Sequence, residues 1–348
     1  MADSALIDLR SDTVTRPGAA MREAMARAEV GDDVFREDPT VRRLEETVAS
    51  LLGKQAALFV SSGTMGNQLS LLAQTRRGDE IIVGEGAHCA WYESGAASAI
   101  SGVQAVVAGA GGMFGADDVA RAIKPEADWY PRTSLVAIEN THNRAGGRVW
   151  PMRQVLEVAG FARSRGLVLH LDGARLWNAS VALRLPVDEL AAPFDSVSVC
   201  FSKGLGAPVG SAICGSSDLI AACRRLRKML GGGMRQAGVL AAAALYALDH
   251  HRDRLAIDHD NARAIAQRMA GVRGAVVDVA AVETNIVMVD TPGVPAQAIV
   301  DRARERGVLV SAFGPERIRI VTHLDVEHTA LRGGEILASV VAEMMGKR

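Results

Sequence analysis

Short runs of β-branched and apolar residues alternate with helical patterns from the N-terminus as far as three consecutive glycines, Gly231–Gly233. The apolar runs predict buried strands at Ala56–Val60, Glu80–Gly84, Val103–Ala108, Ser134–Glu139, Leu167–Asp172 and Ser196–Phe201. Amphipathic or Ala-rich helices are predicted between them, among others at Val41–Leu52, Met65–Gln74, Val155–Arg165 and Ala174–Leu183. This alternation is typical of an α/β fold, in which helices cover both faces of a mostly parallel sheet.

A seventh strand of the same sheet, Ser211–Gly215, follows Phe201 after only the short turn Gly204–Gly210. A parallel connection needs a crossover of about a dozen residues or more. The turn is too short for one, so we expect the seventh strand to be antiparallel to the sixth.

The pattern changes after the three glycines. One long helical stretch is predicted from about Arg235 to Met269. It is followed by predicted strands and a closing helix at Ala275–Val279, Asn285–Val289, Val308–Ala312, Arg317–Val321 and Val326–Met345. We therefore expect a large domain over residues 1–245 and a smaller C-terminal α+β domain over residues 246–348.

Composition narrows the classes of partner. The 348 residues include 39 basic and 40 acidic side chains, so nucleic acid and acidic membrane surfaces are not expected partners. The N-terminus has no apolar signal region, and the apolar stretch Gly238–Leu248 is too short for a membrane span of about 20 residues. The four cysteines lie far apart without a C-x-x-C pair, which predicts no disulfides, no metal site and a cytoplasmic location.

The first candidate for chemistry is the turn Ser62-Gly63-Thr64, where a strand ends and a helix begins. Free backbone N–H groups at a helix start favour an anion, and glycine lets a phosphate approach the backbone. The alternative is an ordinary turn with Thr64 as the helix N-cap. The chain has neither a complete G-x-G-x-x-G nor a G-x-x-x-x-G-K-[ST] motif, which excludes a standard dinucleotide or ATP loop.

Two charged residues follow buried strands. Asp172 ends a strand, at the edge of the sheet where α/β proteins bind ligands, although it could equally cap the next helix. Lys203 follows the next strand and precedes a glycine turn. Loss of hydration there would make its amine nucleophilic, whereas a solvated turn lysine is the alternative.

These three candidates have one common explanation. Pyridoxal phosphate needs an amine for a Schiff base, an acid beside its pyridine nitrogen and an anion site for its phosphate. Lys203, Asp172 and the turn at Gly63 and Thr64 supply all three. The sequence therefore predicts pyridoxal 5'-phosphate as the cofactor.

Longer motifs extend over nearly the whole chain: Leu9-Arg-Ser-Asp-Thr-Val-Thr15, Gly31-Asp-Asp-Val, Ser62-Gly-Thr-Met-Gly-Asn67, Glu139-Asn-Thr-His-Asn143, Asp172-Gly-Ala-Arg175, Ser202–Ser211, Met229–Gly238 and Ile320-Val-Thr-His-Leu-Asp325. In these motifs the chain resembles the low-specificity L-threonine aldolase family. That family belongs to the fold-type I pyridoxal-phosphate enzymes, which implies a seven-stranded central sheet. By the resemblance, Gly63 and Thr64 bind the cofactor phosphate, Lys203 forms the Schiff base and His88 stacks on the pyridine ring.

The resemblance also implies how the substrate is held. Ser11, Arg175 and Arg319 match groups that bind the substrate carboxylate, and the planar fork of arginine suits that task. Lys228 and Arg235 match residues that are directed toward the cofactor phosphate of a neighbouring subunit. We therefore expect a homotetramer whose active sites are shared across a dimer interface.

Three positions depart from the family pattern. Phe35 stands where the family usually has tyrosine, so any role of that hydroxyl is absent. Arg36 stands where glycine is common, and Gly18 replaces a threonine. The segment 1–16 is expected to line the active site.

The reaction implied is retro-aldol cleavage of L-threonine, L-allo-threonine and other β-hydroxy-α-amino acids to glycine and an aldehyde. His88 and His142 are the candidates for the base that takes the β-hydroxyl proton, because histidine titrates in the useful range. Glu93 could orient this pair. The alternative is a β-eliminating lyase with the same cofactor, which would release pyruvate and ammonia.

The remaining histidines carry weaker expectations. His250, His251 and His259 fall in a polar stretch of the long helix and are expected to be solvated. His170 shares a strand face with Asp172 and is expected to be a packed, hydrogen-bonded residue.

Overall fold

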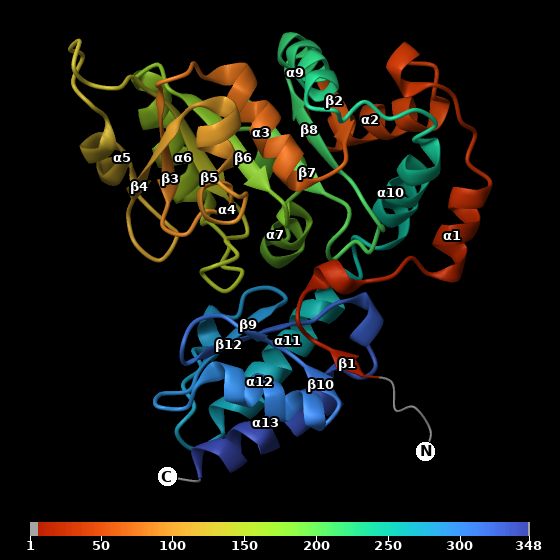
Figure 1. The fold of residues 1–348 in the computed structure, drawn as a ribbon, viewed down its shortest axis with the longest axis vertical. Helices are drawn as coiled ribbons and strands as arrows, with labels where there is room; N and C mark the ends of the chain where they lie inside the picture. The colour runs from red at the N-terminus through yellow and green to blue at the C-terminus, as the bar shows by residue number, and fades with distance from the viewer. Residues whose placement is uncertain (1–5, 347–348) are drawn as a thin grey trace.

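A seven-stranded sheet forms the centre of the larger part of the molecule (Figure 1). The computed structural model describes residues 6–346. The strand order is β2-β8-β7-β6-β5-β3-β4, and β8 is antiparallel to both of its neighbours while the remaining pairs are parallel. The strands are β2 (Ala56–Val60), β3 (Glu80–Gly84), β4 (Gln104–Ala108), β5 (Thr133–Glu139), β6 (Val168–Gly173), β7 (Ser196–Cys200) and β8 (Ser211–Gly215). The predicted α/β fold, its seven strands and the antiparallel β7–β8 pair are confirmed.

Helices cover both faces of this sheet, and alternate residues of a strand enter different clusters, as its pleat requires. In β2, Ala57 and Phe59 join one apolar cluster, whereas Leu58 and Val60 join another. The helices of this part are α1 (Ala19–Ala26), α2 (Pro39–Leu51), α3 (Gly63–Gln74), α4 (His88–Trp91), α5 (Ala116–Ala122), α6 (Met152–Ser164), α7 (Leu176–Leu183), α8 (Val187–Ala191), α9 (Ser217–Met229) and α10 (Gly238–His250).

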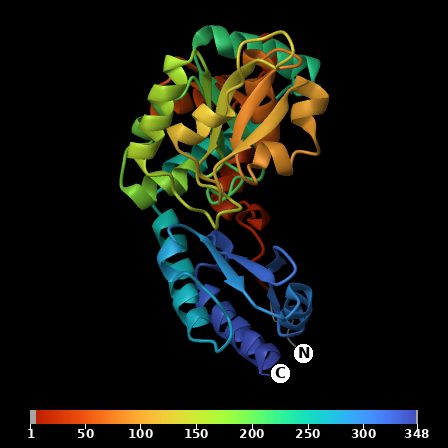
Figure 2. The same ribbon diagram turned by 90° about the vertical axis from the view of Figure 1, so that its left-hand side faces the viewer.

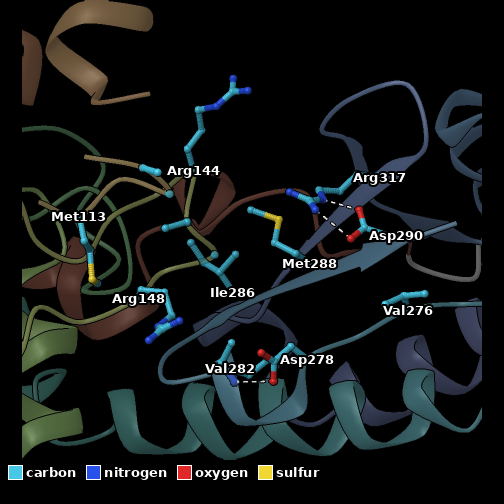
Figure 3. Close-up of a pocket in the computed structure, with 15 residues that line it drawn as sticks. Met113, Arg144, Arg148, Val276, Asp278, Val282, Ile286, Met288, Asp290 and Arg317 are labelled. Carbon is cyan, nitrogen blue, oxygen red and sulfur yellow. Dashed lines mark hydrogen bonds and ion pairs between the residues drawn. The ribbon is translucent and has the colours of Figure 1, made fainter. Parts of the chain in front are cut away.

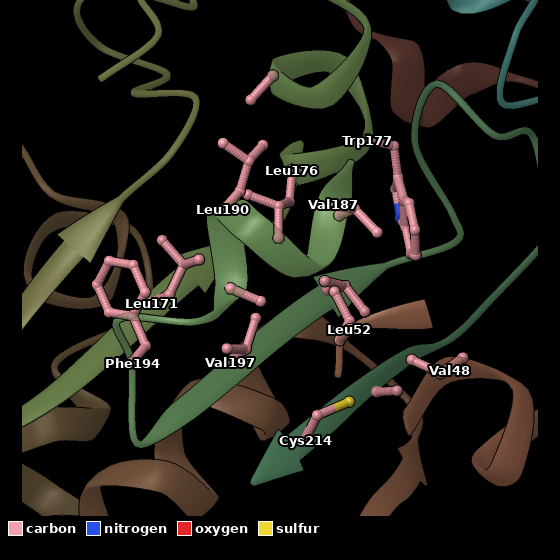
Figure 4. Packing of buried hydrophobic residues seen from close by; sticks show 14 of the residues in the cluster. Val48, Leu52, Leu171, Leu176, Trp177, Val187, Leu190, Phe194, Val197 and Cys214 are labelled. Atoms are coloured by element: carbon pink, nitrogen blue, oxygen red, sulfur yellow. The ribbon is translucent and has the colours of Figure 1, made fainter. Parts of the chain in front are cut away.

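The main core lies where α2, α7 and α8 pack on the sheet (Figure 4). Leu176, Trp177 and Leu190 lie in one apolar cluster with Leu171 of β6 and Val197 of β7, and all five are almost fully buried. Burying one such side chain stabilises the fold by about 1.5–3 kcal/mol. This packing fixes the carboxyl ends of β6 and β7, where Asp172 and Lys203 were predicted to act.

The second part of the molecule contains a three-stranded antiparallel sheet in the order β11-β12-β9 (Figures 1 and 2). Its elements are α11 (Leu255–Ala270), β9 (Ile286–Asp290), α12 (Ala296–Glu305), β10 (Val308–Leu309), β11 (Ser311–Ala312), β12 (Arg317–Val321) and α13 (Ala330–Met345). The N-terminal strand β1 (Ile7–Asp8) pairs in parallel with β10, and Ile7 and Leu9 are buried in this part's apolar cluster. Residues 7–9 therefore pack in the second part of the molecule, and the chain then enters the first part before α1. The boundary at residue 245 stays a prediction.

Some predicted elements of the second part are wrong. The long helix predicted from Arg235 to Met269 is two helices, α10 and α11, because the polar run from Asp249 to Arg254 offers no continuous apolar face. The strand predicted at Ala275–Val279 is a single bridge from Val276 to Asp290, followed by a turn that the Asp278 carboxylate caps.

Two further differences concern strands and helices near the C-terminus. The strand predicted at Val308–Ala312 is divided into β10 and β11, which pair with β1 and β12 respectively. The helix α12 was not predicted. Among residues 6–346, no helix is both long and apolar enough to cross a bilayer.

Candidate active site

Asp172 lies at the carboxyl end of β6 and is 5% exposed. Its Oδ2 accepts a hydrogen bond from Asn67 Nδ2 at 2.8 Å, and its Oδ1 accepts one from the backbone N–H of Ala174 at 3.2 Å. It does not cap a helix, since the N-cap of α7 is Arg175. Within residues 6–346 this carboxylate forms no ion pair, so its buried charge faces only neutral donors. A buried carboxylate of this kind favours a cationic ligand.

Lys203 lies in the turn that follows β7 and is half-buried. Its carbonyl oxygen accepts a hydrogen bond from the Thr15 hydroxyl at 3.5 Å, which ties the N-terminal segment to this turn. In the described part of the chain the lysine amine has no hydrogen bond or ion pair. It is close enough to Asp12 and His88 for its charge to act on both.

The turn at Gly63 and Thr64 begins α3 beside the end of β7. Ser62, rather than Thr64, is the N-cap: its hydroxyl accepts a hydrogen bond from the backbone N–H of Met65 at 3.1 Å. A Cβ on Gly63 would lie 2.9 Å from Cys200 Sγ, and one on Gly66 would lie 2.5 Å from Ser198 Oγ. The two glycines therefore allow the helix start to approach β7 closely.

His88 begins α4, and 31% of its side chain is exposed. Its Nδ1 lies 2.9 Å from Oε1 of Glu93, a carboxylate that is itself buried. Burial lowers the pKa of His88, but the hydrogen bond with Glu93 and the charge of Asp172 outweigh it, so the net pKa is raised. Glu93 is thus a partner of His88, and not a carboxylate on a helix surface.

His142 is 1% exposed and lies in a different setting. Its Nδ1 accepts a hydrogen bond from the backbone N–H of Ala145 at 3.2 Å, and its Nε2 is 3.8 Å from Oε2 of Glu139. The Glu139 carboxylate also accepts hydrogen bonds from the backbone N–H groups of His88 and Asn143. The motif Glu139–Asn143 therefore connects both candidate histidines through one carboxylate.

Arg175 is buried and paired with Asp12, a residue that was not predicted for the site. Its Nε and Nη2 donate to the two oxygens of Asp12, both at 2.7 Å, and its Nη1 lies 3.4 Å from Asn143 Oδ1. Burial raises the pKa of Asp12, but Arg175 and, less strongly, Lys203 lower it well below its usual range.

Arg319 of β12 reaches the same amide oxygen. Its Nη1 donates to Asn143 Oδ1 at 2.9 Å and its Nη2 to the carbonyl oxygen of Arg10 at 3.2 Å. Its Nε is buried and has no partner in the described part of the molecule. Burial and the neighbouring Arg175 lower the pKa of Arg319 to about 10. Two guanidinium groups thus meet here, and among the residues that the structure describes only Asp12 forms an ion pair with either of them, which favours binding of an anion.

Three further residues, Ser11, Lys228 and Arg235, were predicted for the site. Ser11 precedes Asp12, and its hydroxyl accepts hydrogen bonds from the backbone N–H and the hydroxyl of Thr13. Lys228 is exposed at the end of α9, and Arg235 is exposed with its Nη1 2.9 Å from Asp32 Oδ2. The buried arginine of this region is Arg227, which pairs with Asp33 and the carbonyl oxygen of Phe59.

The departures from the family pattern have local consequences. Phe35 is 70% exposed, and Arg36 adopts the left-handed backbone region with φ of 61°. That region favours glycine, because a Cβ costs energy there. Gly18 is the N-cap of α1, which lacks a side-chain cap.

The expectation of solvated histidines is wrong for two of three. His259 is 4% exposed and within 3.1 Å of Asn178 Nδ2, and His251 is half-buried with its Nδ1 2.7 Å from the carbonyl oxygen of Leu205. The cause is the break between α10 and α11, which turns His259 toward α7. His250 is exposed. His170 is a packed, hydrogen-bonded residue, as expected.

Two further features lie near these residues. Ligand atoms of His88, Glu93 and Asp172 lie within 4.8 Å of one another, but Asn67 Nδ2 donates to both carboxylates, and a donor in that position disfavours a metal ion. A cleft of about 500 Å³ lies between the turn containing Arg144 and strand β9, and none of the site residues predicted from the sequence lines it (Figure 3).

Fold and site together define a fold-type I pyridoxal-phosphate enzyme: the buried carboxylate of Asp172, the amine of Lys203 and the start of α3 fit the cofactor's nitrogen, aldehyde and phosphate. A model of the beta-eliminating lyase family matches residues 8–292. Low-specificity L-threonine aldolase 1 of Arabidopsis thaliana is 47% identical to this chain, and the alignment covers 91% of each protein. The low specificity L-threonine aldolase of Escherichia coli is 45% identical, and the alignment covers 94% of this chain and 96% of that protein. The Leishmania major threonine aldolase structure shares the fold, with a TM-score of 0.83, 21% identity and coverage of 97% and 100%.

The chain belongs to the beta-eliminating lyase family, and the two relatives named above are low-specificity L-threonine aldolases. The predicted family, fold and class of enzyme, a lyase that depends on pyridoxal phosphate, are confirmed.

Sequence reasoning did not place Asp12, Asn67 or Asn143 in the site, although the structure shows them in contact with predicted site residues. All three lie within the quoted motifs, but each acts through a partner that is distant in the sequence: Asp12 and Arg175 are 163 positions apart. The available signal was the presence of polar residues beside apolar runs, which indicates a buried polar group but not its partner.

Proposed function

We propose that this chain cleaves L-threonine and L-allo-threonine, and other β-hydroxy-α-amino acids, to glycine and an aldehyde. The observation that carries this proposal is the pair Arg175 and Arg319: both contact the neutral oxygen of Asn143, and within the described residues only Arg175 forms an ion pair, with Asp12. A substrate carboxylate supplies the missing negative charge. Lys203 and Asp172, at the ends of neighbouring strands, fit an α-amino acid bound through pyridoxal phosphate.

The residues that would hold the cofactor are those described above. Gly63 and Thr64 would bind its phosphate, Asp172 would pair with its pyridine nitrogen, Lys203 would supply the amine for its aldehyde, and His88 would contact its ring. When bound, pyridoxal phosphate accepts the electron pair that is released as the Cα–Cβ bond breaks.

The chain's own residues then position the substrate and move protons. Arg175 and Arg319 fix the carboxylate, so that only one bond at Cα is aligned for cleavage. The hydrogen bond to Glu93 leaves His88 Nε2 free to take the proton of the β-hydroxyl, directly or through a water. The product aldehyde leaves, and a proton returned to Cα completes glycine.

The contacts favour His88 over His142 as this base. Nδ1 of His142 already accepts a backbone hydrogen bond, and its Nε2 faces Glu139 in a buried position. Nε2 is therefore the nitrogen that carries the proton when the ring is neutral, and it cannot accept a second one. His142 remains a candidate for orienting Glu139, which holds the backbone of His88.

We further propose a homotetramer in the cytoplasm, with Lys228 and Arg235 directed at the cofactor phosphate of a neighbouring subunit. Both side chains are exposed in the single chain, which leaves them accessible to a partner. The cysteines are four buried, unpaired thiols, as in proteins of a reducing compartment. Light scattering of the purified protein measures the assembly state.

The test is to incubate the purified protein and pyridoxal phosphate with L-threonine and L-allo-threonine separately, with alcohol dehydrogenase and NADH to report acetaldehyde. We expect acetaldehyde and equimolar glycine from at least one isomer, and neither from Lys203→Ala. The competing activity is β-elimination, after which the matching family is named. Pyruvate from L-serine, with no acetaldehyde from either threonine isomer, would replace the proposal with that reaction.

A further inference from the structure

Asn67 occupies a buried position on α3, where an amide side chain needs a full set of partners. It is 1% exposed. Its Nδ2 donates one hydrogen to Asp172 Oδ2 and the other to Glu93 Oε1, both at 2.8 Å. Its Oδ1 lies 3.1 Å from Nε2 of His170. All of the polar groups of this amide are therefore used.

The orientation of this amide follows from its neighbours. If the amide were flipped, its oxygen would face two carboxylates, which repel it. With Nδ2 toward the carboxylates, Oδ1 needs a donor, and this role requires a hydrogen on Nε2 of His170. Burial lowers the pKa of His170 to about 4, so the ring is neutral at physiological pH and its Nδ1 is an acceptor.

The chain of donors continues behind His170. Ser196 Oγ lies 2.8 Å from His170 Nδ1, and it accepts a hydrogen bond from Gln74 Nε2 at 2.8 Å. Gln74 therefore donates to Ser196, Ser196 donates to His170, and His170 donates to Asn67. The chain ends at the Asp172 carboxylate.

The two carboxylates depend on Asn67 to different degrees. Glu93 is also held by Gln68 Nε2 at 2.8 Å and by His88. Asp172 has no other side-chain donor among the residues that the structure describes, since its second bond comes from the backbone of Ala174. Loss of Asn67 would release Asp172 more than Glu93.

We propose that Asn67 is the positioning residue for Asp172: it aims this carboxylate at the pyridine nitrogen of the cofactor, and His170 fixes the direction of its amide. This inference rests on the proposed role of Asp172. It adds a residue that does not touch the substrate and that acts on the cofactor through another side chain.

The test compares pyridoxal phosphate with its 1-deaza analogue, in which a carbon replaces the pyridine nitrogen. Affinities of the cofactor-stripped full chain for both compounds are measured by fluorescence titration. The wild type should prefer pyridoxal phosphate. Asn67→Ala should lower the affinity for pyridoxal phosphate by about tenfold, the order of effect of a hydrogen bond to a charged group, and should change the affinity for the analogue by less than about threefold.

Gln68→Ala is the matched control, because Gln68 is also buried and bonds Glu93 but not Asp172. It should retain the wild-type preference. If Asn67→Ala does not fold, as a thermal melt would show, His170→Phe serves instead: it removes the donor to Asn67 Oδ1 and should reduce the preference about threefold.

The outcomes separate the inference from the function on which it rests. Equal weakening of both compounds by Asn67→Ala, or no weakening, would overturn the inference and leave the role of Asp172 intact. A wild type that binds both compounds equally would overturn both, because Asp172 would then not act on the ring nitrogen.

Discussion

The buried pair of Asp12 and Arg175 leads to the most direct prediction from this structure. Asp12 is fully buried and Arg175 is 5% exposed, and two hydrogen bonds of 2.7 Å join them. Asp12→Asn keeps the shape of the side chain but removes its charge, which leaves a buried guanidinium without a counterion. Removal of one partner of a buried pair costs about 3–5 kcal/mol. We expect the lower end, about 3 kcal/mol, because the asparagine oxygen still accepts one hydrogen bond.

Denaturant unfolding monitored by circular dichroism measures this difference in free energy. The corresponding fall in melting temperature is roughly 6 °C, at about 2 °C per kcal/mol for a chain of this size. Asp290→Asn is the matched control. Asp290 also receives two bonds from one arginine, Arg317, but the two side chains are 39% and 45% exposed, so its loss should cost at most about 1 kcal/mol.

The pH dependence supplies a second check of the same pair. The pKa of Asp12 is lowered in the folded chain, so its stabilising effect is present above the ordinary value of 3.8 and is lost as the pH falls below it. The difference between wild type and Asp12→Asn should thus be constant from about pH 5 to 8 and should shrink in stronger acid. Equal stability of Asp12→Asn and Asp290→Asn at neutral pH would refute the reasoning.

Three other predictions concern a histidine base, a buried histidine and the backbone. Glu93→Gln should lower the pKa of His88, because Glu93 helps to raise it. The acid limb of the profile of kcat/KM against pH should then move to lower pH, and an unmoved limb would exclude His88 as the titrating base. Burial lowers the pKa of His259 to about 4, so the unfolded chain binds a proton that the folded chain does not, and stability falls from pH 6.5 toward pH 4. His259→Gln should remove up to about 3 kcal/mol of that fall, measured by urea titration at both pH values, and an unchanged slope would contradict this prediction. Arg36→Gly should stabilise the chain by about 0.5–1 kcal/mol in the same titration, because φ is 61° there, and a loss of stability would show that the side chain compensates for the strain.

The sheet could be predicted almost strand by strand from the sequence, and the second part of the molecule could not. Strands buried on both faces are continuous apolar runs with sharp ends, as in β7 and β8, where every residue is buried. Near the C-terminus, strands β10 and β11 are only two residues long, and their partners decide where they end: Val308 and Leu309 pair with β1, while Ser311 and Ala312 pair with β12. No local pattern contains this information, because β1 is about 300 positions away from β10.

Site residues could be predicted where a local pattern placed them, and could not where a distant segment decided their burial. Asp172 and Lys203 follow buried strands, and the carboxyl ends of neighbouring parallel strands meet at one edge of the sheet, so their proximity follows from topology. Asn67 and Gln68 lie inside a helix, where a polar pair normally indicates the solvent-exposed side. They are buried because α3 packs against the sheet on one side and near the Glu93 carboxylate on the other. A charge that is buried at the end of a strand needs hydrogen-bond donors or acceptors from the element that covers it. Polar residues such as Asn67 and Gln68, in a helix that directly follows a strand and a glycine turn, are therefore candidates for this role before they are assigned to the surface.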